Sequence, residues 1–152
     1  MKTKLFGDIA FDDHDAVLPA QGPLTAPVPL DMDEMDLTPD AVRALAGFLD
    51  SLPAHLEAIE ARFIADYDEI ADFVPGWLAE ELPEEFSRVF GGMKPETVGA
   101  KQLWSILRLT RIWASEQDTV VLDFQMTGFD VDHMLGVYMT LDGAITEIGI
   151  ES

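Results

Sequence analysis

The closing third of the chain, residues 119–151, limits the fold more than any other stretch. Asp142 and Gly143 stand between two runs of alternating apolar residues, which is typical of a two-residue β-hairpin turn. That turn predicts the facing pairs Leu141–Ala144, Met139–Thr146, Val137–Ile148 and Leu135–Ile150. Because side chains alternate along a strand, these pairs share one face of the hairpin, and only Thr146 among them is polar. We expect this face to belong to the core.

The opposite face of the hairpin is mixed, with Tyr138 and Ile145 among polar neighbours, so it faces solvent or forms a contact surface. Residues 120–126 alternate as a half-buried strand does. Residues 106–114 fit either a helix or a strand, and their β-branched and aromatic side chains favour the strand. With a first strand at residues 5–11, these segments predict an antiparallel sheet of four to five strands, made of the C-terminal meander and the N-terminal strand.

Two amphipathic helices are predicted in the middle of the chain. Thr38 provides a capping hydroxyl ahead of a proline, and an apolar stripe at helical spacing extends to Leu52. A second stripe extends from Leu56 to Val74. We expect the two helices to form an antiparallel hairpin that covers one face of the sheet. Pro83 predicts short helical pieces between residues 77 and 92.

The remaining segments complete a single α+β domain over residues 1–152. Residues 12–29 hold several prolines and are predicted to be a loop, with a short edge strand near residues 28–32. A chain of this length can bury a core without disulfides or metals to hold it together. No internal repeat divides it.

The composition narrows the function classes. There is no cysteine, which excludes disulfides, thiolate nucleophiles and sulfur-ligated metals. The formal net charge of −20 opposes binding to nucleic acid or to an anionic membrane, and makes a basic protein the natural partner. The start of the chain has no long apolar run, so we expect a cytoplasmic protein. No nucleophile turn, zinc-protease motif or phosphate-binding loop is present, and neither catalytic residues nor a cofactor are predicted.

Three stretches together resemble a bacterial protein family. They are KLFGDIAF at the start, LRLTRIWASEQDTVVLDFQMTG in the C-terminal half and DHMLGVYMTLDGAITEIGIES at the end. An opening strand that ends in FGD, an acidic helical middle and a closing hairpin with a DG turn are similar to domain of unknown function two thousand and four. The resemblance implies an α+β fold and, by analogy with other small acidic families, an immunity-type or regulatory role. It implies no catalytic residue.

One short stretch carries metal-ligand chemistry, because it offers oxygen and nitrogen donors side by side: Asp12, Asp13, His14 and Asp15. Consecutive residues rarely converge on one ion, so a solvated loop is the simpler interpretation. The alternative function is a small metal-dependent hydrolase that uses these residues, with His133 as a further candidate. Asp31, Asp33 and Asp36 do not form a calcium loop of the EF-hand type, because glycine is missing at its sixth position.

Residues 57–85 hold carboxylates in large excess over the single basic residue, Arg62. The carboxylates are Glu57, Glu60, Asp66, Asp68, Glu69, Asp72, Glu80, Glu81, Glu84 and Glu85. A solvated helix face explains them most simply. The sharper interpretation is a docking surface for a basic protein, in which charge speeds the encounter and makes binding sensitive to salt. The basic residues that follow are expected to offset these acids within the fold: Arg88, Lys94, Lys101, Arg108 and Arg111.

The sequence therefore favours a non-enzymatic, protein-binding module of the immunity or regulatory type. The metal-dependent hydrolase is the alternative. A third hypothesis is a homodimer formed through the mixed sheet face around Tyr138 and Ile145.

Overall fold

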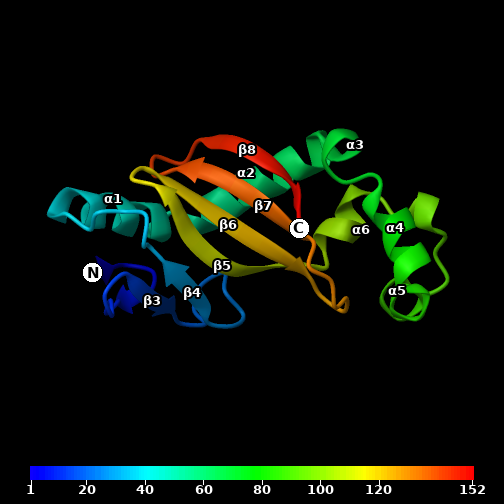
Figure 1. The fold of residues 1–152 in the computed structure, drawn as a ribbon, viewed down its shortest axis with the longest axis horizontal. Coiled ribbons are helices and arrows are strands. Elements are labelled where there is room, and N and C mark those ends of the chain that lie inside the picture. Colours follow the sequence, from blue (N-terminus) through cyan, green and yellow to red (C-terminus); the bar gives the residue numbers. More distant parts are fainter.

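A sheet of six strands crosses the molecule and carries helices on one of its faces (Figure 1). The structure is a computed structural model, and it describes all residues 1–152. The strands lie in the order β3-β4-β5-β6-β7-β8, and the fold is α+β as predicted. Their bounds are Asp15–Leu18, Val28–Asp31, Leu107–Glu116, Thr119–Met126, Met134–Thr140 and Ile145–Glu151. The sheet is therefore larger than the predicted four to five strands.

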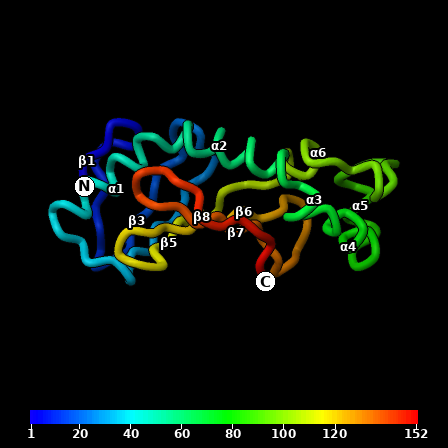
Figure 2. The backbone as a smooth tube through the Cα atoms, turned by 90° about the horizontal axis from the view of Figure 1, so that it is seen from above, coloured from blue at the N-terminus to red at the C-terminus, as the bar shows by residue number.

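All neighbouring strands are antiparallel except β4 and β5, which pair in parallel with Leu30 opposite Ile112. A parallel pair needs a long crossover connection, because the chain must return to the same end of the sheet. Residues 32–106 make that connection and contain the α-helices. Viewed from above, α1 and α2 lie over one side of the sheet (Figure 2). The crossover therefore supplies the layer that covers the core face.

The hairpin β7–β8 has the predicted register away from its tip, with Val137 opposite Ile148 and Leu135 opposite Ile150. Near the tip the prediction is wrong, because a register shift lies between Tyr138 and Met139, and Met139 faces Ile145. The loop has three residues instead of two: Thr140 N donates to Ala144 O at 2.9 Å, and Gly143, with φ of +97°, ends the loop. A three-residue loop that ends in a left-handed glycine is the next commonest solution for such a hairpin.

This longer loop changes which residues share a face. Ile145 packs against the core instead of lying beside Tyr138, so the predicted mixed face loses that apolar side chain. Asp142 stabilises the loop, since its carboxylate accepts a hydrogen bond from the Thr140 hydroxyl and lies 3.4 Å from Ala144 N. The Thr140 hydrogen bond lowers the pKa of Asp142.

The predicted first strand over residues 5–11 is wrong. The chain instead forms a small separate hairpin, β1 (Lys2–Thr3) and β2 (Gly7–Asp8). Gly7 has a φ of +73°, which turns the chain too tightly for a continuous strand. The carboxylate of Asp50 fixes the turn, because it accepts hydrogen bonds from the backbone of residues 4 and 5 at 2.7 and 3.0 Å.

The sheet takes its first strand, β3, from the segment that was predicted to be a loop. The strand ends just before Pro19, so the prolines that indicated a loop follow it instead of interrupting it. The short strand predicted near residues 28–32 is present as β4, but it lies inside the sheet and not at its edge.

The helical region begins as predicted. Helix α1 (Pro39–Asp50) starts at Thr38, whose Oγ1 accepts a hydrogen bond from Ala41 N at 3.1 Å. Helix α2 (Leu52–Ala65) follows after a single residue, Ser51. One residue is too short a connection to reverse the chain, so α1 and α2 follow one another along the sheet instead of forming the predicted hairpin (Figures 1 and 2).

The second stripe is divided among short elements beyond α2. These are α3 (Tyr67–Ile70), α4 (Val74–Glu81), α5 (Pro83–Phe90), a short 3-10 helix (Pro95–Thr97) and α6 (Ala100–Trp104). The break predicted at Pro83 separates α4 from α5. The core lies between this helical layer and the sheet, where Leu135, Val137 and Met139 have no exposed surface. Leu141, which was expected with them, is half-buried because it sits in the loop.

Candidate functional site: an acidic helical arm

Helices α4 and α5 lie beyond the end of the sheet and form an arm (Figures 1 and 2). We define the acidic arm as residues 66–85, together with the rest of α5. Its inner side is aromatic: the ring centroids of Phe86 and Phe90 are 4.9 Å apart, and those of Phe90 and Phe129 are 6.1 Å apart. Val89 packs so closely on Gly128 that a Cβ there would lie 2.6 Å from Val89 Cγ2. These contacts attach the arm to the loop between β6 and β7.

The predicted acidic residues divide into two groups in space. Those from Asp66 to Glu85 lie on the arm, whereas Glu57 and Glu60 lie on α2. On the arm two carboxylates have a cationic partner within 4.0 Å: Asp66 lies 2.5 Å from Arg62, and Glu85 lies 3.8 Å from Arg88. All six of the others are exposed and have no cationic partner: Asp68, Glu69, Asp72, Glu80, Glu81 and Glu84. The arm therefore carries an uncompensated negative charge.

The basic residues predicted to offset these acids do so at one position only. Arg88 pairs with Glu85 of the arm, whereas Arg111 pairs with Asp31 of β4 at 2.7 Å. Lys94, Lys101 and Arg108 have no carboxylate within 4.0 Å. The expected offset within the fold is therefore largely absent.

Phe73 is the feature of the arm that the sequence reasoning missed. It directly precedes α4, beside Asp72, and its side chain is 53% exposed. Val17, at 57%, is the other large apolar side chain that is exposed, and it lies on β3 at the far end of the molecule (Figure 1). No signal in the sequence indicated this exposure, because Phe73 follows Ile70 at helical spacing and would share its apolar face in a continuous helix. The chain is instead interrupted between α3 and α4, and Phe73 lies in that interruption. The three tryptophans, by contrast, are all partly buried.

The stretch predicted as a metal candidate forms a tight turn. Asp12 and Asp15 exchange two backbone hydrogen bonds, of 2.8 and 3.0 Å, and Asp13 has a φ of +59°. The His14 ring lies 3.0 Å from the Asp13 carboxylate. His133 packs against Trp77 of α4, at 4.3 Å between ring centroids and with the rings tilted by 50°, at the other end of the molecule. The structure therefore does not bring these candidates together around one point.

Only Asp15 of that stretch approaches further carboxylates, those of Asp31 and Asp33, whose oxygens lie within 4.8 Å of one another. Asp31 already has a cation, Arg111, and this hydrogen-bonded pair lowers the pKa of Asp31. The negative charge of Asp31 is the main cause that raises the pKa of Asp33. An internal ion pair therefore already uses one member of this group.

On the face of the sheet away from the helices, side chains from neighbouring strands pack against one another. Asp123 is 6% exposed and accepts a hydrogen bond from Trp113 Nε1 at 3.0 Å. Burial raises the pKa of Asp123, and the Trp113 hydrogen bond partly opposes that shift. Val121 on the same face has no exposed surface. The ring of Tyr138 meets Trp113 edge-on at 6.3 Å. The homodimer through this face stays a prediction, and Ile145 is not part of the face.

Comparison with protein-family models, with the curated proteins and with the solved structures found no match to this chain. The resemblance to domain of unknown function two thousand and four therefore stays a prediction. No helix combines the length and apolar character needed to cross a membrane.

Proposed function

We propose that the protein is a binding module for a basic protein, which it contacts through the acidic arm. The observation that carries this proposal is the exposure of Phe73 among carboxylates that have no cationic partner inside the fold. An aromatic side chain held at 53% exposure loses hydrophobic stabilisation in the free protein, and a partner that covers it restores that stabilisation. Interfaces commonly gain most of their affinity from a few such aromatic anchors.

The charge of the arm complements the anchor. Carboxylates around an interface steer an oppositely charged partner and exclude anionic competitors, and salt weakens this effect. An immunity-type or regulatory role is the concrete form of the proposal, as the resemblance implies. In that role the basic partner is an enzyme or toxin whose activity the arm blocks.

A capture experiment with matched variants tests the proposal. Wild-type protein, Phe73→Ala and Val17→Ala are immobilised and exposed to an extract of the source cell at low salt. Val17→Ala is the control, because it removes the other exposed apolar side chain at the opposite end of the molecule. We expect Phe73→Ala to weaken binding of the captured basic protein at least about tenfold, and Val17→Ala to leave it unchanged.

A second pair of variants separates the arm from the overall charge. Glu80→Lys with Glu84→Lys changes the arm, and Asp12→Lys with Asp13→Lys makes the same charge change at the other end. We expect only the first pair to weaken binding strongly, and binding of wild type to weaken with added salt. Equal effects of the two pairs, or binding that does not depend on salt, contradict the proposed arm.

A further inference from the structure

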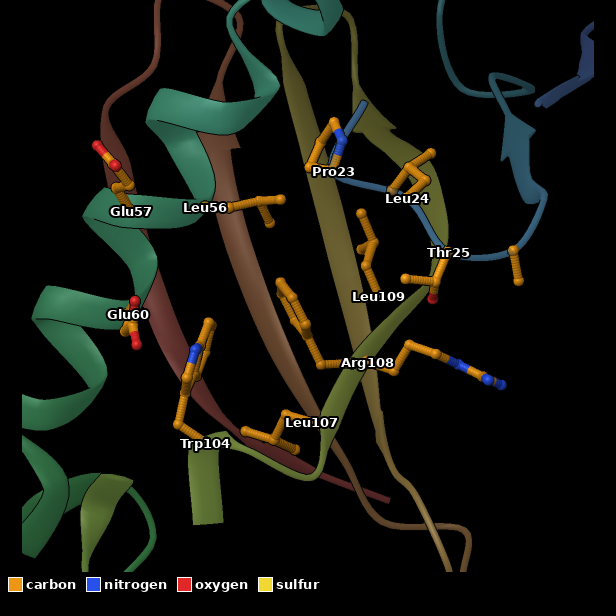
Figure 3. A pocket seen from close by; sticks show the side chains of 12 residues that line it. Pro23, Leu24, Thr25, Leu56, Glu57, Glu60, Trp104, Leu107, Arg108 and Leu109 are labelled. Carbon is orange, nitrogen blue, oxygen red and sulfur yellow. The ribbon is translucent and has the colours of Figure 1, made fainter. Parts of the chain in front are cut away.

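A cavity of about 330 Å³ opens between α2 and the proline-rich segment ahead of β4 (Figure 3). This volume lies in the range of small-molecule sites. The core side of the sheet provides its floor, through Leu109 of β5 and Phe124 of β6, which face each other across the two strands. Leu56 of α2 lies on one side of the cavity, and Leu24 on the other.

The walls are stiff, so the cavity is held open. Trp104 of α6 is fixed between two aromatic rings, at 5.5 Å from Phe63 and 5.6 Å from Phe124 between ring centroids. On the opposite side, Pro23 restricts the backbone next to Leu24, whose side chain is buried. A cavity with an apolar floor and a fixed aromatic wall is pre-formed for an apolar or aromatic ligand.

The charges at the mouth select the kind of ligand. Glu57 and Glu60 project from α2 at the edge of the cavity, and neither has a cationic partner within 4.0 Å. Glu60 and Trp104 lie next to each other on one side of the cavity in this view, whereas Arg108 extends away from it (Figure 3). A carboxylate beside an indole is a favourable environment for an ammonium group, which gains an ion pair and a cation–π contact.

We propose that this cavity binds a small organic amine, with its apolar body over Leu109 and Phe124 and its ammonium group beside Glu60 and Trp104. Binding of an anionic amphiphile of the same size is disfavoured, because it is repelled by the two carboxylates at the mouth and by a chain whose formal net charge is −20. The site is separate from the acidic arm, so it adds a ligand to the protein-binding role instead of describing its partner.

Three probes with the same alkyl chain and different head groups test the ligand class: octylammonium, octanol and octanoate. Calorimetric titration of the full chain is expected to rank them in that order of affinity. Glu60→Gln is expected to weaken octylammonium binding about three- to fivefold and to leave octanol unchanged. Glu69→Gln is the control, because it removes one charge from an exposed position outside the cavity. Equal affinities for the three probes overturn the proposal.

The position of the site is tested separately. In NMR spectra of the wild-type protein, octylammonium is expected to shift the indole N–H signal of Trp104 and not those of Trp77 and Trp113. Thr25→Phe narrows the mouth from an exposed position and should weaken all probes that bind, whereas Ala20→Phe, the same kind of change outside the lining, should not. Absence of binding at millimolar probe, or shifts of the other tryptophans alone, overturns the proposal.

Discussion

The hydrogen bond from Trp113 Nε1 to Asp123 supports a quantitative prediction. Trp113→Phe keeps an aromatic ring on the face of the sheet away from the helices but removes the donor, leaving a carboxylate that is 6% exposed without that hydrogen bond. A hydrogen bond to a charged group contributes about 1.5–3 kcal/mol to stability. Arg111 still attracts Asp123 in the variant, so we expect the lower end, about 1.5 kcal/mol. For a chain of this size this loss lowers Tm by about 3–6 °C.

The loss should depend on pH in a defined direction. Burial raises the pKa of Asp123 above its value of 3.8 in the unfolded chain, and the Trp113 hydrogen bond opposes that shift. Removing the donor raises the folded-state pKa further. The destabilisation is therefore fully present above both folded-state pKa values, and it shrinks as pH falls through them and the carboxyl becomes protonated.

Urea unfolding of wild type and Trp113→Phe at about pH 7 and about pH 4 measures the difference directly. The same substitution in an Asp123→Asn background is the control, because no charge then depends on the donor. There the cost should be small and independent of pH, and the difference between the two backgrounds isolates the pair. An equal loss at both pH values, or the same loss in the Asn background, would refute this account of the Trp113–Asp123 pair.

Three further predictions concern single residues. Thr38→Ala removes the cap of α1 and should cost about 1 kcal/mol in chemical unfolding, whereas Thr38→Ser should be nearly neutral. Gly47→Ala, inside α1, adds a Cβ with no atom within 4 Å and should raise the free energy of unfolding by about 0.5–1 kcal/mol. Gly143→Ala, at φ +97° and with a Cβ 2.8 Å from His55 Cε1, should lower it by at least about 1 kcal/mol. Changes of stability in the same direction for both variants contradict the argument. Burial lowers the pKa of His55, which stacks on Phe48, so on acidification the unfolded chain binds a proton at His55 at a higher pH than the folded protein does. The free energy of unfolding should therefore fall as pH drops below 6.5. His55→Gln should reduce that fall between about pH 7 and pH 5.5.

The sequence predicted the parts of the fold in which local signals agree with one another. Strands β6 to β8 alternate over long runs, and the start of α1 combines a capping hydroxyl with proline, so both are found as expected. Strand β5, for which the spacing fitted a helix as well, is present as its β-branched and aromatic side chains indicated. The errors fall where one residue changes the path of the chain. The three-residue loop at Gly143 moved Ile145 to the core face, and the tight turn at Gly7 replaced the predicted first strand. Both turns depend on left-handed glycine, and a glycine can adopt either hand.

The candidate sites were less predictable because they depend on tertiary contacts. The excess of carboxylates was visible, but their division between the arm and α2 follows from where α2 ends. The cavity has no local signal at all, since its lining comes from the loop ahead of β4, from α2, from α6 and from the sheet. The exposure of Phe73 was not predictable from its spacing, because it follows Ile70 at a helical interval and is exposed only where the chain is interrupted between α3 and α4.

The position of the arm allows stability and binding to be tested apart. Glu80 and Glu84 are exposed, contact no cation, and lie outside the layer that covers the sheet. If like charges on the arm only repel one another, then Glu80→Lys with Glu84→Lys should leave the free energy of unfolding unchanged or raise it by a few tenths of a kcal/mol. The same variant should lose affinity for the basic partner. Urea unfolding and binding titrations on one preparation make the comparison, and a parallel loss of stability and affinity would show that the carboxylates support the fold instead of a partner.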